Sequence, residues 1–322
     1  MKRSQKTLLL LLAALLCACA PLQGETPARP EEQLVVGVVV HMSESSWRDR
    51  LHESLENSAL KRNIQLIQIE TERTQDSQIQ AMRALITYQV DAIVVSPLVQ
   101  RGWDNVLREA KAAEIPVLMV HRNVQTEETD VVAAYIGADY ERQGELAARF
   151  IQERTRQSAG PHLIMELHGT VGASDTVERS RGMRRVFGQS EAYEIYATIS
   201  CNFMYSWARE SMRAHLKSGR MPDIVISYSD NMTLGVIAAM EEEGVVPGRD
   251  ILILSFDAQQ DAMALLAEGK INCIIENEPD VGEQVMDAVC ALAAGETVQN
   301  TYLPSELFRE TDDLSAFAPR GY

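Results

Sequence analysis

Short apolar runs alternate with amphipathic stretches from Leu34 to about residue 294. The runs are rich in Val and Ile, which is typical of strands buried on both faces of a sheet, and the stretches between them have the period of helices. The expected strands are 34–40, 64–69, 92–96, 117–121, 135–138, 162–168, 193–199, 224–227, 251–256 and 271–276. The expected helices are 47–61, 78–88, 103–113, 140–154, 177–187, 206–217, 232–243, 259–267 and 282–294.

This order of elements predicts the fold class. Strands that alternate with helices favour α/β architecture with a parallel, doubly wound sheet. A second series of the same kind begins after residue 138, which indicates two similar lobes with a cleft between them. In such sheets ligands bind beyond the carboxyl ends of the strands, so the loops after each strand are where candidate site residues are sought.

The N-terminal segment has the pattern of an export signal. Three positive side chains in the first six residues precede an apolar segment, 7–16, that is too short to serve as a stable membrane anchor. The following Leu-Cys-Ala-Cys resembles a bacterial lipobox, in which Cys19 fits better than Cys17 because a small residue precedes it. We expect 1–18 to be a removed signal peptide, Cys19 to be lipidated and 19–33 to be a flexible tether. The alternative is an ordinary secretion signal with incidental cysteines.

Composition excludes several classes of function. The formal net charge is −16, and an acidic chain repels nucleic acid, whose phosphates need Lys and Arg. The three cysteines beyond the signal, Cys201, Cys273 and Cys290, do not form a disulfide framework. No Cys/His cluster has the spacing of a zinc site, so no metal and no cofactor are expected.

A short polar loop follows the first apolar run. It reads Ser-Glu-Ser-Ser-Trp-Arg at 43–48 and includes Glu44, Ser45 and Trp47. A carboxylate, hydroxyls and an indole suit a small polyol, because they bind hydroxyl groups and cover C–H faces. The alternative is a helix start in which Ser43 caps the helix and Trp47 packs into the core.

Charged residues follow other predicted strands. Arg122 follows the strand 117–121, and a guanidinium there could bridge two neighbouring hydroxyls. Arg179 could do the same from the second lobe, although either Arg could instead form a surface ion pair. Asp230 and Asp257 could accept hydrogen bonds from hydroxyls, with helix capping as the alternative for Asp230. Glu276 is either a cleft carboxylate or a hinge residue.

The glycine-rich loop 169–174 also falls after a predicted strand. It resembles a phosphate-binding loop but lacks the Lys that such a loop needs. We interpret it as a tight turn that lines the cleft and includes Ser174.

Ordered motifs across residues 34–310 resemble type I periplasmic sugar-binding proteins of the ribose- and galactofuranose-binding type. They include the 43–48 loop, Asp-Ala-Ile at 91–93, Gly-Thr-Val-Gly-Ala-Ser at 169–174, Asp-x-Met at 230–232, and Pro-Gly-x-Asp-Ile-Leu at 247–252. The resemblance implies two Rossmann-like lobes joined by three crossing strands near 137–138, 276–277 and 301–302. One lobe would contain 34–137 and 277–301, and the other 138–276 and 302–322.

The resemblance also implies a function. A lipid-anchored monomer outside the cytoplasm would capture a monosaccharide, galactofuranose-like or another pentose or hexose, and deliver it to an ABC permease in the membrane. In such proteins the residue equivalent to Phe203 packs on the sugar ring. The chain departs from the usual pattern at His121, at Ser229–Asp230 and at 202–205. His121 could make binding depend on pH between 5 and 8.

Other functions stay open or are disfavoured by the sequence. The same fold could present its ligand to a histidine kinase or chemoreceptor as a sensor, and the sequence does not separate this role from import. An enzyme is not expected, because no nucleophile elbow, zinc motif or dinucleotide fingerprint is present. A sugar-responsive repressor would need an N-terminal helix-turn-helix, where this chain has the export signal.

Overall fold

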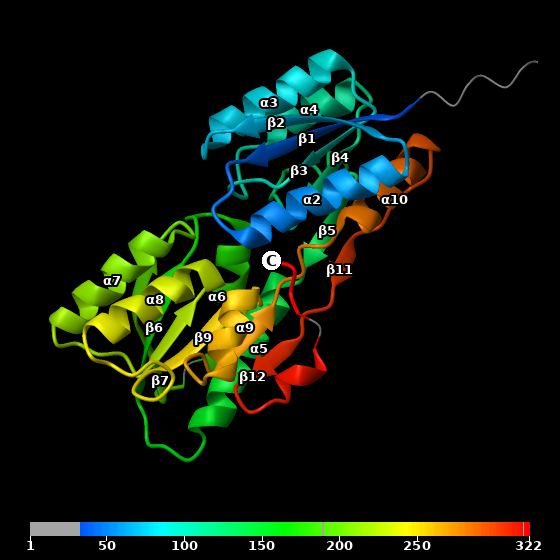
Figure 1. Ribbon diagram of the computed structural model, residues 1–322. Helices are drawn as coiled ribbons and strands as arrows, with labels where there is room; N and C mark the ends of the chain where they lie inside the picture. The colour runs from blue at the N-terminus through cyan, green and yellow to red at the C-terminus, as the bar shows by residue number, and fades with distance from the viewer. Residues whose placement is uncertain (1–32, 189, 318) are drawn as a thin grey trace, which may run out of the picture. The chain divides into compact units, whose positions relative to one another are not determined.

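A computed structural model describes residues 33–188, 190–317 and 319–322, which form two α/β lobes, each built on a six-stranded sheet (Figure 1). The predicted signal peptide, Cys19 and most of the tether lie outside the described residues. No helix in the described ranges is long and apolar enough to cross a membrane.

The sheet of the first lobe is parallel throughout, in the order β2-β1-β3-β4-β5-β11. Its strands are β1 Val35–His41, β2 Gln65–Thr71, β3 Ala92–Val95, β4 Val117–Val120, β5 Ala134–Ala138 and β11 Thr301–Leu303. Its helices are α2 Ser46–Lys61, α3 Gln75–Tyr88, α4 Asp104–Ala112 and α10 Gly282–Ala293.

Helices cover both faces of this sheet, which explains why β1 is apolar at nearly every position. Val36, Val38 and Val40 pack on one face with α2 and α10. Val39 points to the other face and packs with α3 and α4. Successive strand residues alternate between faces, so a strand covered on both sides needs a continuous apolar run.

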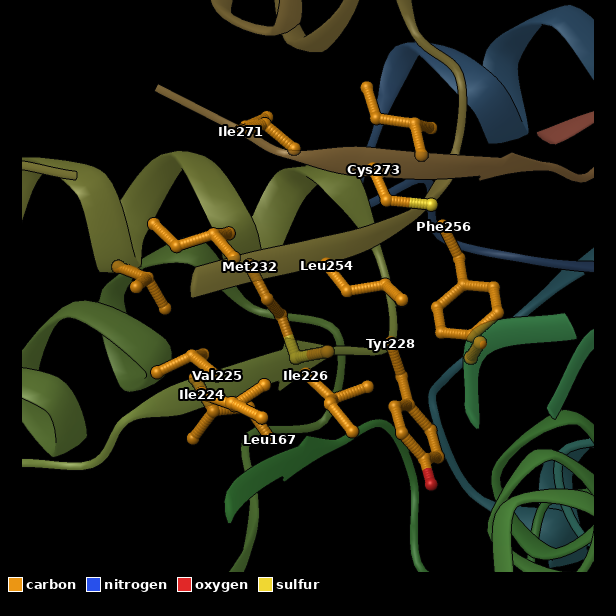
Figure 2. Packing of buried hydrophobic residues seen from close by; sticks show 14 of the residues in the cluster. Leu167, Ile224, Val225, Ile226, Tyr228, Met232, Leu254, Phe256, Ile271 and Cys273 are labelled. Carbon is orange, nitrogen blue, oxygen red and sulfur yellow. The ribbon is translucent and has the colours of Figure 1, made fainter. Parts of the chain in front are cut away.

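The second lobe has the order β7-β6-β8-β9-β10-β12, in which only the β10–β12 pair is antiparallel. Its strands are β6 His162–His168, β7 Tyr193–Ser200, β8 Ile224–Ser227, β9 Leu252–Asp257, β10 Cys273–Glu276 and β12 Leu307–Arg309. Its helices are α5 Tyr140–Thr155, α6 Ser174–Phe187, α7 Tyr205–Lys217, α8 Asp230–Glu242, α9 Gln260–Ala267 and a 3-10 turn, η1, Leu314–Ala316. Figure 2 shows Met232 of α8 beside Ile226 of β8 and Leu254 of β9, and Cys273 of β10 belongs to the same cluster.

Three links join the lobes. They run from β5 to α5, from β10 to α10 and from β11 to β12. β11 pairs with β5 as far as Leu303, so the third link follows Leu303 and lies slightly later than the expected crossing at 301–302. The sequence did not predict β11 or β12 as strands, because each has three residues and no long apolar run. The role of these links as a hinge stays a prediction.

Helices α5 and α6 pack with their backbones in close contact. A Cβ added to Gly182 would lie 2.0 Å from the carbonyl oxygen of Glu141, and one added to Gly144 would lie 2.0 Å from that of Arg179. Glycine is needed at both positions because no side chain fits between the helices. This contact fixes the position of the turn of α6 that carries Arg179.

We predict that Gly182→Ala destabilises the fold by about 1–3 kcal/mol, because the added methyl group forces the two helices apart. The sign of the change in the free energy of unfolding identifies close packing, because Gly→Ala inside an unobstructed helix stabilises by roughly 0.5–1 kcal/mol. Urea unfolding gives the free energy of unfolding. Gly321→Ala is the control, because its Cβ would meet nothing within 4 Å. A Gly182→Ala variant as stable as the wild type would contradict the close packing.

Candidate functional site

A cavity lies between the lobes, at the carboxyl ends of strands from both sheets. Its volume is about 420 Å³, including space at the mouth that is open to solvent. The first lobe lines it with Glu44, Ser45, Trp47, Arg48, Ser96, His121 and Arg122. The second lobe and the link after β10 line it with Tyr140, Asp175, Arg179, Phe203, Ser229, Asn231, Asp257 and Asn277.

Hydrogen bonds join the lobes around this cavity. Ser46 Oγ donates to Gln259 Oε1 at 2.7 Å. Arg73 Nη2 donates to the carbonyl oxygen of Asn202 at 2.8 Å. Asn231 Nδ2 donates to the carbonyl oxygen of Glu44 at 3.1 Å. The lobes are therefore in contact in this structure, and the cavity is enclosed by both of them.

Arg179 forms the buried cationic part of the second lobe's wall. Its Nε donates to Gln143 Oε1 at 2.9 Å, and its Nη1 donates to the carbonyl oxygen of Tyr228 at 2.8 Å. The guanidinium carbon lies 4.2 Å from the ring centre of Phe256 and 4.9 Å from that of Tyr140. Nη2 is buried and has no hydrogen-bond partner in the described part of the chain. It is a fixed donor available to a ligand.

Arg122 provides the matching group from the first lobe. Its Nε donates to Asp175 Oδ2 at 2.9 Å, and its guanidinium carbon lies 5.0 Å from the ring centre of Phe203. Burial raises the pKa of Asp175, but Arg122 and Arg179 outweigh burial and hold that pKa below its usual value. Nη1 of Arg122 is buried without a partner among the described residues.

Glu44 contributes a buried negative charge to the first lobe's side of the cavity. Both carboxylate oxygens accept from Arg48 Nε, at 3.0 and 2.9 Å. Burial raises the pKa of Glu44, but Arg48, Arg122 and Arg73 outweigh burial, so the net shift is downward. The carboxylate is therefore ionised at neutral pH and is held in place by the helix that it precedes.

His121 packs against Trp47 in the wall of the cavity. Its ring meets that of Trp47 edge-on, with the ring centres 4.7 Å apart, and neither ring nitrogen has a partner in the described residues. Burial, followed by the charges of Arg48 and Arg122, lowers the pKa of His121 to about 3. The imidazole therefore stays neutral between pH 5 and 8, and the structure does not support the pH dependence considered from the sequence.

Asp257 and Asp230 form a buried acidic pair at the second sheet. Burial raises the pKa of Asp257, and burial together with the charge of Asp257 raises that of Asp230. Asp257 accepts from Asn277 Nδ2 at 3.3 Å and faces the cavity. Asp230 accepts from Ser255 Oγ and, at 2.7 Å, from the backbone N–H of Gln259. Asp230 therefore anchors the segment after β9 and does not itself line the cavity.

Backbone strain concentrates around the cavity. Five residues without the freedom of glycine have positive φ there: His121 (59°), Asn202 (49°), Phe203 (61°), Asp257 (115°) and Ala258 (69°). Each such residue costs free energy and persists only where the surrounding structure holds it. Such strain is typical of functional sites.

Seven of the ten ligand-contact residues expected from the sequence line the cavity, and three do not. The seven are Glu44, Ser45, Trp47, Arg122, Arg179, Phe203 and Asp257. Ser174 Oγ instead accepts from the backbone N–H of Asn123 at 2.9 Å. Glu276 forms an ion pair with Arg320, and Asp230 lies behind the wall. Ser229, one position before Asp230, lines the cavity and is the N-cap of α8.

Several residues that line the cavity were not predicted from the sequence. Arg48 and Asp175 each sit one residue beyond a residue that was singled out, on the first turn of a helix. Tyr140 is the first residue of α5, directly after one link between the lobes, and Asn277 belongs to another link, where no local pattern marks a residue as facing a cavity. No group of three His, Cys, Asp or Glu side chains in the described ranges could hold a metal ion.

The chain has detectable similarity to known proteins over most of its length. A sequence profile described as a periplasmic binding protein domain matches residues 36–297. The chain belongs to this family. Members are extracytoplasmic, and the two-lobe α/β fold predicted from the sequence is confirmed.

Individual relatives in this family are binding proteins for sugars. The galactofuranose-binding protein YtfQ of Escherichia coli is 32% identical over 259 residues, which cover 80% of this chain and 81% of that protein. A Mycobacterium smegmatis protein solved with β-D-fucofuranose is 36% identical, with a TM-score of 0.83 over 86% of this chain and 91% of that one. The binding component of an arabinose ABC transporter from Shewanella sp. ANA-3, bound to α- and β-L-arabinofuranose, is 32% identical, with a TM-score of 0.82 over 88% and 93%.

The contact between Gln100 and Glu178 gives a prediction for pH. Gln100 Nε2 of the first lobe donates to Glu178 Oε1 of the second at 3.0 Å, and burial raises the pKa of Glu178 to about 7. Between about pH 4 and 7 the folded state therefore keeps a proton that the unfolded state releases. Through this group the free energy of unfolding falls as pH rises over that range.

The Glu178→Gln variant has no carboxyl group at this position and should not lose stability in this way. Its free energy of unfolding should therefore rise relative to that of the wild type between pH 4.5 and 7.5. Urea unfolding at a series of pH values measures the difference. Glu296→Gln, at an exposed position, is the control. Parallel curves for Glu178→Gln and the wild type would contradict the prediction.

Proposed function

We propose that this protein captures a monosaccharide in its furanose form in the cavity between the lobes and delivers it to an ABC importer. The observation that carries the proposal is a pair of buried guanidinium donors, Arg122 Nη1 and Arg179 Nη2, one from each lobe, that have no partner among the residues the structure describes. A buried cationic donor without an acceptor is unfavourable, and sugar hydroxyls would supply acceptors to both groups.

The other lining residues match the remaining surface of a sugar. The Phe203 ring offers an apolar face to ring C–H groups, as the Trp47 indole does from the other lobe. Glu44 and Asp257 carry oxygens that could accept from hydroxyl groups. Hydroxyl groups both donate and accept, so a site that contains charged donors and acceptors discriminates strongly among sugars.

The furanose form is proposed from the relatives. The proteins described above that are at least 30% identical are named for galactofuranose or were solved with β-D-fucofuranose or L-arabinofuranose. L-Arabinofuranose, D-fucofuranose and D-galactofuranose share one configuration around the five-membered ring and differ in the exocyclic group. We therefore infer that this chain recognises that ring, and we expect D-galactose, D-fucose and L-arabinose to be the informative ligands.

The two-lobe construction supports capture followed by release. A ligand that contacts both lobes stabilises the closed form only to the extent that it binds this form better. The three links between the lobes would serve as the hinge. Both halves of the cavity come from one chain, so we propose a monomer. Delivery to a permease is proposed over presentation to a sensor kinase, because one of these relatives is an ABC transporter component.

Arg122→Ala should abolish sugar binding. The three sugars, at about 100 times Kd, should add about 2.7 kcal/mol to the stability of residues 34–322, and this would raise the melting temperature of the wild type. A thermal-shift assay measures the rise. Arg83→Ala is the control. It removes an exposed guanidinium bonded to Glu109 of α4 and should show the same rise in melting temperature as the wild type. A full shift in Arg122→Ala would contradict the assignment of the site.

We also propose that Cys19 carries a lipid that holds the protein to the membrane, which rests on the sequence pattern alone. Cys19→Ser should move the full-length protein to the soluble fraction and eliminate labelling by radioactive palmitate. Cys17→Ser is the matched control and should stay bound and labelled. A Cys19→Ser protein that remains labelled would show that this cysteine is not the anchor.

A further inference from the structure

The N-terminal turn of α6 reaches across the cavity and holds the loop that follows β4. Arg122 Nε donates to Asp175 Oδ2 at 2.9 Å, and both side chains are nearly completely buried. The backbone N–H of Asn123 donates to Ser174 Oγ at 2.9 Å. Arg122 and Asn123 belong to the first lobe, and Ser174 and Asp175 belong to the second. Both contacts therefore exist only when the lobes are together.

We propose that Asp175 is a positioning residue, which orients the Arg122 guanidinium toward the sugar and makes this orientation depend on lobe closure. The proposal rests on the proposed function and deepens it. Asp175 acts through Arg122, and its effect on affinity should therefore disappear when Arg122 can no longer form the same contact.

The geometry around Arg122 supports this role. A guanidinium is planar, so an acceptor at Nε together with a ring against its face fixes the direction of the remaining nitrogens. Asp175 supplies the acceptor, and Phe203 supplies the ring at 5.0 Å. Nη1 is buried and has no partner within the described ranges, and Arg122 lines the cavity. Since both partners of Arg122 belong to the second lobe, opening the cleft would release the guanidinium from both.

Asp175 is itself held in place. Its Oδ1 accepts from the backbone N–H of Thr176 at 2.7 Å, which leaves Oδ2 for Arg122. The charges of Arg122 and Arg179 keep this carboxylate ionised in spite of its burial. Asp175→Asn preserves the size of the side chain but removes the charge, and its amide could present a donor to Nε. The variant therefore tests orientation with little change in packing.

Ser174→Ala provides a matched control. It removes the neighbouring contact between the lobes, to Asn123, without touching Arg122. If Asp175 only closes the cleft, its replacement should weaken binding by the same factor in the wild type and in an Arg122 variant. If Asp175 orients Arg122, Asp175→Asn should cause the larger loss, and that loss should depend on Arg122.

The experiment uses residues 34–322 and the three sugars named above. Calorimetry gives Kd, and stopped-flow fluorescence gives the release rate, for the wild type, Asp175→Asn, Ser174→Ala, Arg122→Lys and the double variant Asp175→Asn/Arg122→Lys. We expect Asp175→Asn to weaken binding about tenfold or more, mainly through faster release, and Ser174→Ala to weaken it only a few-fold. The double variant should bind within about twofold of Arg122→Lys.

Losses that add in the double variant, or an Asp175→Asn Kd within about twofold of the wild type, would overturn the proposal. Asp175→Ser serves as a second variant if Asp175→Asn does not fold.

A second readout separates this proposal from the proposed function. Spin labels on exposed sites of α3 and α7 report the distance between the lobes without any ligand. If the wild type binds none of the sugars, the proposed function fails, and the inference is judged by this distance. A wider opening in Asp175→Asn than in Ser174→Ala supports the coupling of Asp175 to closure, and equal distances overturn it.

Discussion

The burial of two guanidinium groups in the seam between the lobes is the constraint on which the site depends. A buried cation is tolerated only where acceptors, counter-charges or aromatic faces surround it. Arg179 has Gln143, the Tyr228 carbonyl and two rings around it, and Arg122 has Asp175 and Phe203. These partners come from helices, strand ends and links of the fold, so the same elements that build the lobes also fix the positions of the donors.

The fold explains why this concentration of charge occurs between the lobes. Both sheets end their parallel strands at the seam, where loops need not follow the apolar pattern that the strands require. The close packing of α5 and α6 fixes the turn that carries Arg179, and positive φ angles around His121, Phe203 and Asp257 aim their side chains. The free-energy cost of strained backbone and buried charge is offset by the burial of apolar side chains in three clusters, one in the second lobe and one on each face of the first lobe's sheet.

The alternation of apolar runs and amphipathic stretches predicted the class of fold, because burial on both faces of a sheet leaves a clear signal in β1, β8 and β9. It missed β11 and β12, whose three residues each carry no such signal. The site residues that were predicted from the sequence are those in loops directly after strands. Asp230 was expected to line the cavity, but Ser229 does so instead. The two are neighbours at the start of α8, and the sequence does not show which of them points toward the cavity. Asp175 and Asn277 depend on contacts between distant segments, which no local pattern reveals.

The central claim is that a furanose occupies the cavity and binds both guanidinium groups. A crystal structure of residues 34–322 grown with L-arabinose, D-fucose or D-galactose tests it most directly. We predict density for a five-membered ring between Phe203 and the first lobe, with hydroxyl oxygens within hydrogen-bonding distance of Arg122 Nη1 and Arg179 Nη2. A sugar bound outside the cavity, or a ligand inside it that leaves both nitrogens without an acceptor, would contradict the account.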